Sequence, residues 1–186
     1  MCIMLAVFMG KVLKKKTAVA GDEVTYSLML RQMQKAAAIQ HKGIASRHAY
    51  SMDGIDYYCG IRDEDIGILR QKYDVIILDI SFENTFDNTN VTFARMVSRL
   101  SACDEKILAG SMLPWKSREC EKKMERIERF LDIKGLKMVT LAACDKEAVS
   151  IIKKHGVEVV LIPFERNPFV ISGENLRSFL ELLKIT

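Results

Sequence analysis

The sequence predicts an α/β fold: a single doubly wound, mostly parallel sheet with helices on both faces. Short apolar runs rich in β-branched residues alternate along the chain with longer amphipathic stretches, which is typical of strands joined by crossover helices. The runs that should lie in the centre of the sheet, such as VIILDI at 75–80, lack polar alternation. Both faces of those strands should therefore be buried.

The predicted strands are short apolar segments, bounded by polar or turn-forming residues. The first of them is the strongly apolar IMLAVF near the beginning of the sequence. The strands are predicted at 3–8, 17–20, 55–59, 75–80, 106–110, 137–142 and 157–162.

The predicted helices fill the intervals between the strands, where apolar residues recur at helical spacing. Asp22 and Ser172 are placed to cap the first and the last of them, and Pro114 ends any helix upstream of it. The helices are predicted at 23–40, 63–72, 90–102, 117–131, 146–155 and 174–184.

Length and composition indicate one globular domain. A chain of 186 residues is long enough for one substantial core and short for two, and no repeat or linker divides it, so we expect a single domain over 1–186. The balance of 49% apolar and 28% charged residues is that of a soluble protein. No apolar run approaches the roughly 20 residues of a membrane span, so an integral membrane segment is not expected.

Cysteine usage and charge indicate the redox compartment of the protein and the kind of partner it binds. The five cysteines are odd in number and widely spaced, without a CxxC pair, so we expect reduced thiols in a cytoplasmic protein and no metal site built on them. The net charge of +4 is modest, and most basic residues are interspersed with acids, which argues against nucleic-acid binding. The segment KVLKKK at 11–16 is the exception, and it allows peripheral contact with an anionic partner.

Asp79 is the main candidate site residue, because it follows the apolar strand at 75–78. In doubly wound folds, ligands bind at the carboxyl ends of strands. A carboxylate there can hold magnesium in a nucleotide hydrolase or accept a phosphoryl group in a signalling receiver. It can also simply turn the chain, since Asp is favoured in turns. The residues alone leave these three interpretations open.

The phosphate-binding half of a nucleotide site is missing from the sequence. Neither G-x-x-x-x-G-K-[ST] nor its variant K-G-G-x-G-K-[ST] occurs, and these loops hold phosphates with backbone N–H groups and a lysine. Gly10 and Lys11 lack a second glycine, while Gly21 is followed by Asp22 and Glu23. Negative charge would lie where a triphosphate should bind. We therefore nominate no catalytic residue and do not expect hydrolysis by an intact P-loop mechanism.

A receiver domain is the competing interpretation of the same acids. Asp22 and Glu23 would hold magnesium, Asp79 would accept the phosphoryl group, and Ser111 would supply the hydroxyl that follows the next strand. However, Ile162 occupies the position where a lysine should precede the proline. The sequence also contains one strand–helix unit too many between Ser111 and that last strand.

Residues 54–184 resemble the carboxyl-terminal two thirds of MinD/ParA-type deviant Walker ATPases, in the divergent pilus-assembly branch related to TadZ and CpaE. Three segments carry the resemblance: KYDVIILDI at 72–80, SACDEKILAGSMLPWK at 101–116 and VEVVLIPFERNPF at 157–169. Their order and spacing suit this family better than a receiver. Residues 1–53 correspond to a divergent or truncated amino-terminal part.

The resemblance implies a P-loop NTPase-like fold and a role for particular residues. Asp79 would be the Walker B acid, and Pro163 and Phe164 would lie beside the base of a bound nucleotide, which makes ATP and Mg²⁺ the implied cofactors. Relatives self-associate, so a homodimer and other protein partners are expected.

Because the Walker A lysine and glycines are absent, we expect a non-hydrolysing binding or localisation factor, in pilus or secretion assembly in a bacterial cytoplasm. The alternatives are a weak ATPase that uses Asp79 and a receiver that is phosphorylated on it.

Overall fold

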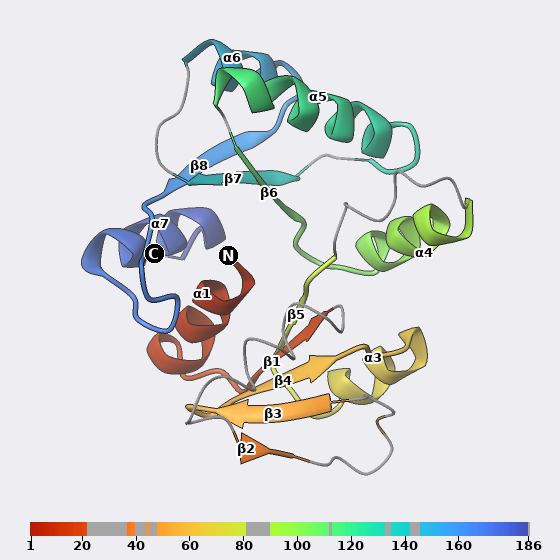
Figure 1. Ribbon diagram of the computed structural model, residues 1–186, viewed down its shortest axis with the longest axis vertical. Helices are drawn as coiled ribbons and strands as arrows, with labels where there is room; N and C mark the ends of the chain where they lie inside the picture. The colour runs from red at the N-terminus through yellow and green to blue at the C-terminus, as the bar shows by residue number, and fades with distance from the viewer. Residues whose placement is uncertain are drawn as a thin grey trace. The chain divides into compact units, whose positions relative to one another are not determined.

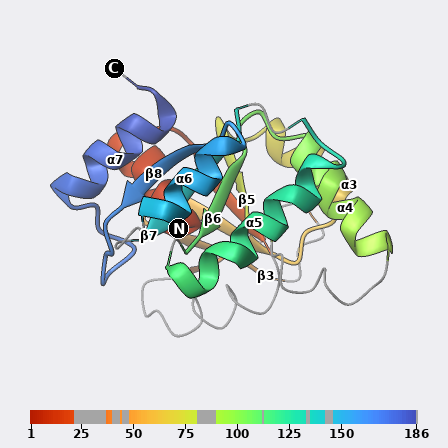
Figure 2. The same ribbon diagram turned by 90° about the horizontal axis from the view of Figure 1, so that it is seen from above.

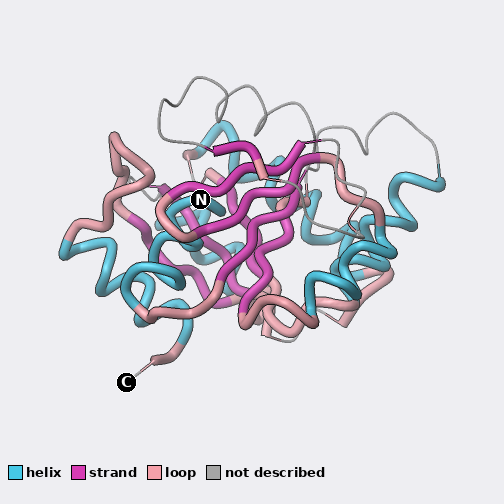
Figure 3. Tube along the Cα trace, turned by 90° about the horizontal axis from the view of Figure 1, so that it is seen from below, coloured by secondary structure: helices cyan, strands magenta, loops and turns pink. Residues whose placement is uncertain are grey.

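The computed structural model describes residues 1–21, 37–39, 44, 48–80, 90–111, 113–132, 135–141 and 146–185. Two compact units make up the chain. Unit 1 comprises Met1–Asn88 with Pro168–Ile171, and unit 2 comprises Thr89–Asn167 with Ser172–Thr186. Figure 3 shows the strands in magenta, the helices in cyan and the loops and turns in pink. Each unit is described by itself below.

The sheet of unit 1 has five strands in the order β2-β3-β4-β1-β5. The central part is parallel: β1 pairs with β4 on one side and with β5 on the other. The pairs β2–β3 and β3–β4 are antiparallel. The strands are β1 (Thr17–Gly21), β2 (Ala37–Ala38), β3 (His48–Met52), β4 (Ile55–Cys59) and β5 (Val75–Leu78).

Strands β3 and β4 form a hairpin that the sequence-based prediction missed. The turn between them is Asp53-Gly54, with φ of 55° and 79°. Positive φ at both central residues is the mark of a type I′ turn, and Asp-Gly is one of its preferred sequences. The signal was therefore present in the sequence, immediately before the predicted strand at 55–59.

One face of this sheet is covered by α3 (Asp63–Arg70). At the start of the helix, the Arg62 N–H donates to Asp65 Oδ2 at 3.0 Å, which satisfies one of the backbone donors there. The helix buries Leu69 against small strand residues, which let the helix approach the sheet closely. The cluster consists of Ala18, Ala20, Ala49, Tyr58, Ile61, Leu69 and Tyr73.

The apolar start of the chain is helical, so the predicted strand at 3–8 is wrong. It forms α1 (Cys2–Val7), which continues as the π-helix η1 (Phe8–Val12), and α1 packs against β1 and β5. Periodicity cannot distinguish a buried strand from a fully buried short helix, because both are apolar throughout. Gly10 lies so close to β4 that a Cβ there would stand 2.9 Å from Ile55 Cγ1.

Unit 2 is built on a parallel sheet in the order β6-β7-β8. Helices α5 and α6 lie on one side of it and α7 on the other (Figure 1), and Figure 2 shows α5 and α6 from above. Met138 and Ile162 of the sheet and Phe179 of α7 are fully buried. The elements are α4 (Asn90–Ser101), β6 (Ile107–Gly110), α5 (Pro114–Glu128), β7 (Lys137–Leu141), α6 (Lys146–Lys154), β8 (Glu158–Ile162) and α7 (Gly173–Leu183).

The α/β class and the mostly parallel pairing are confirmed. Six predicted strands and five predicted helices occur within a few residues of their expected bounds. The described strands form two hydrogen-bonded ladders, where the prediction had one sheet. The predicted helix at 23–40 lies mostly outside the described residues, but Ala37–Ala38 form β2, so its final turn is wrong. The single domain over 1–186 remains a prediction.

Candidate functional site

The carboxyl edge of the parallel ladder β4-β1-β5 is the candidate site of unit 1. Strand β1 ends at Gly21, and it pairs with β4 up to Gly21 and with β5 up to Ala20. The Gly60 N–H donates to the Gly21 carbonyl at 2.9 Å, and the Asp79 N–H donates to the Ala20 carbonyl at 2.8 Å. Asp79 is therefore held at the end of the strand beside β1, as the sequence predicted.

The topology makes this edge a switch point. From β1 the chain moves to β4 on one side, and from β4 it returns through α3 to β5 on the other side. Ligands of doubly wound folds bind where the strand order reverses in this way. The segment that follows β1 begins at Asp22 and Glu23, which lie outside the described residues.

Asp79 is half-buried at this edge. Within the described part of the chain, no group of three or more His, Cys, Asp or Glu residues could hold a metal ion. A magnesium ion at Asp79 would accordingly need other oxygens, and Mg²⁺ commonly takes them from water and from substrate phosphates. The carboxylate fits one ligand of such an ion.

In unit 2, the other predicted site residues also follow the carboxyl ends of strands. Ser111 comes after β6, while Pro163 and Phe164 come after β8. Pro163 is half-buried, whereas the Phe164 side chain is 71% exposed. The Ser111 hydroxyl accepts a long hydrogen bond from the Leu113 N–H at 3.5 Å, so it takes part in a local turn.

The predicted sites divide between the units. Asp79 belongs to unit 1, and Ser111, Pro163 and Phe164 belong to unit 2. A common nucleotide site of Asp79 with Pro163 and Phe164 stays a prediction. The receiver arrangement of Asp79 with Ser111 also stays a prediction. Its other members, Asp22 and Glu23, lie outside the described residues.

Two buried polar atoms of unit 2, which sequence reasoning did not single out, lack a hydrogen-bond partner among the described residues. They are Thr140 Oγ1, near the end of β7, and Asn175 Oδ1, in the first turn of α7. The Asn175 side-chain amide donates to Glu165 Oε2 at 3.3 Å. Buried acceptors are normally satisfied, so these atoms leave hydrogen-bonding capacity unused. No pattern in the sequence identifies such atoms, since Thr and Asn are common at these positions.

A tyrosine network occupies the interior of unit 1. The Tyr73 hydroxyl donates to Asp56 Oδ2 at 2.5 Å and lies 2.6 Å from the Tyr58 hydroxyl. Burial raises the pKa of Tyr58 and of Tyr73, and the hydrogen bond to Asp56 raises the pKa of Tyr73 further. Burial also raises the pKa of Tyr57, whose hydroxyl has no partner in the described part of the chain. All three phenols stay protonated at neutral pH and do not act as bases.

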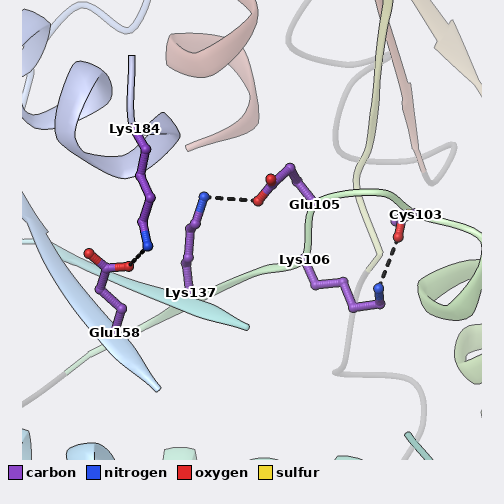
Figure 4. Close-up of polar contacts among 6 residues, drawn as sticks. All are labelled: Cys103, Glu105, Lys106, Lys137, Glu158 and Lys184. Carbon is purple, nitrogen blue, oxygen red and sulfur yellow. Dashed lines mark hydrogen bonds and ion pairs between the residues drawn. The ribbon is translucent and has the colours of Figure 1, made fainter. Parts of the chain in front are cut away.

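Charged side chains make polar contacts at the amino edge of the unit 2 sheet (Figure 4). Lys137 Nζ lies 2.9 Å from Glu105 Oε2, and Lys184 Nζ lies 3.2 Å from Glu158 Oε2. Lys106 Nζ donates to the Cys103 carbonyl at 2.9 Å. The first contact links the beginnings of β6 and β7, the second joins the beginning of β8 to the end of α7, and the third lies within the segment before β6.

Comparison with known proteins adds evidence on the fold. No protein-family model matches the chain, and no curated protein matches it. Among solved structures, the MinD cell division protein of Aquifex aeolicus matches with a TM-score of 0.64 at 12% identity, covering 100% of this chain and 92% of that chain. The MinC:MinD cell division protein complex of Aquifex aeolicus matches with a TM-score of 0.64 at 12% identity, covering 99% of this chain and 91% of that chain.

These matches cover 99–100% of the chain and agree with the MinD-like fold that the resemblance of residues 54–184 implied, whereas the TadZ/CpaE branch stays a prediction. At 12% identity they establish the fold and not the activity. No helix in the described part of the chain is long and apolar enough to cross a membrane. The chain has a mixed α/β fold that is similar to the fold of these MinD structures.

Proposed function

We propose that this protein is a degenerate P-loop ATPase-like factor that binds protein partners without hydrolysing a nucleotide. One observation carries the proposal: Asp79 keeps its position at the end of the strand beside β1, while the sequence after β1 has lost the phosphate-binding signature. Gly21 is followed by Asp22 and Glu23, and the next lysine in the sequence is Lys35.

The charge argument rests on the sequence of residues 21–23. A nucleoside triphosphate is bound where backbone N–H groups and a lysine neutralise its charge. Two carboxylates directly after β1 act in the opposite direction, because like charges repel strongly where water is excluded. Loss of the lysine together with the gain of two acids favours a protein that does not hold a triphosphate tightly.

Partner binding is the remaining role that the fold supports. The solved MinC:MinD complex shows that a protein of this fold assembles with another protein. In this chain, Phe164 exposes a large apolar side chain next to β8, and exposed aromatic residues are frequent at interfaces. We include self-association as a homodimer in the proposal, and a role in pilus or secretion assembly of the TadZ/CpaE kind.

A weak ATPase is the alternative, and the position of Asp79 directly after the carboxyl end of β5 favours it. A half-buried acid at a topological switch point can still hold a magnesium ion that is bound to phosphate oxygens. In that case the acidic pair after β1 would reduce affinity without abolishing it.

Calorimetric titration with MgATP and MgADP separates the two functions. The wild type is compared with Asp79→Asn and with the control Asp74→Asn, which changes an exposed aspartate before the other end of β5. The Lys16 N–H donates to Asp74 Oδ2 at 2.9 Å, and the side-chain amide of the control variant keeps a carbonyl oxygen that can accept this bond. We expect no binding tighter than the millimolar range in any of the three proteins.

Binding below the millimolar range that Asp79→Asn weakens and Asp74→Asn leaves unchanged would establish the ATPase-like alternative. The receiver interpretation is tested on the same proteins with acetyl phosphate. Acid-labile phosphate on the wild type and on Asp74→Asn, but not on Asp79→Asn, would support it.

A further inference from the structure

We draw no further inference here: the strongest candidate, the outer edge of β8 in the unit 2 sheet with the exposed side chains of Leu161 and Phe164, carries none because nothing in the described structure shows what covers it.

Discussion

The two edges of the unit 2 sheet are built differently. At the amino edge, Lys137 and Glu105, and Lys184 and Glu158, form ion pairs at 2.9 and 3.2 Å. Near the carboxyl edge, Thr140 Oγ1 is buried without a partner among the described residues, and Phe164 is mostly exposed. Among the described residues, charged side chains of the amino edge form ion pairs, whereas Thr140 Oγ1 and Phe164 near the carboxyl edge have no such contact. We infer that the amino edge serves stability and that the carboxyl edge is available for binding.

The largest difference in the free energy of unfolding is expected between variants of a buried and of an exposed phenylalanine. Phe179 of α7 is fully buried, so Phe179→Ala should lower the free energy of unfolding by about 3–5 kcal/mol. Phe164→Ala at the carboxyl edge should change it by less than about 0.5 kcal/mol. Urea denaturation followed by circular dichroism measures both. A loss of stability for Phe164→Ala as large as that for Phe179→Ala would show that this edge is structural.

An intermediate difference in stability is expected between variants of two buried tyrosines of unit 1. Tyr73→Phe removes the hydroxyl that joins Asp56 and Tyr58, and should cost about 1–3 kcal/mol, because both partners remain. Tyr57→Phe removes a buried hydroxyl for which the described residues offer no partner, and should be neutral or stabilise by up to about 1 kcal/mol. Thermal unfolding of the two variants under one buffer condition compares them directly. Equal destabilisation would mean that Tyr57 has a partner in the folded protein.

The smallest difference in stability is expected between one variant at each edge of the unit 2 sheet. Glu105→Gln leaves the ammonium group of Lys137, whose side chain is 8% exposed, without this charged partner. The expected cost is about 1 kcal/mol, because Glu105 itself is 58% exposed and screened by water. Thr140→Val should be neutral or slightly stabilising, since it removes a hydroxyl that no described residue pairs with. If Thr140→Val cost more than Glu105→Gln in the same unfolding assay, the contrast between the edges would be lost.

Sequence reasoning identified most of the fold, because the strands are near-continuous apolar runs and the helices have apolar residues at helical spacing. The runs at 75–80 and 157–162 and the amphipathic segments at 90–102 and 174–184 became strands and helices near the expected bounds. The run at 3–8 failed because a fully buried helix and a fully buried strand are equally apolar. The strand β3 was missed, although Asp53-Gly54 is a strong hairpin signal.

The candidate sites were only partly predictable. The position of Asp79 at a strand end followed from local sequence alone, and the structure shows β1 beside it. The backbone contact of Asp74 with Lys16, and the contact of Tyr73 with Asp56, depend on strand order. Strand order is set by tertiary packing, so no local pattern could reveal these contacts.

Calorimetry with MgATP on the wild type and on Asp79→Asn tests the central claim, that the fold has kept its Walker B position and lost its phosphate-binding half. The account predicts no heat of binding at nucleotide concentrations below the millimolar range for either protein. Saturable binding by the wild type in that range, weakened by Asp79→Asn and unchanged by Asp74→Asn, would contradict it.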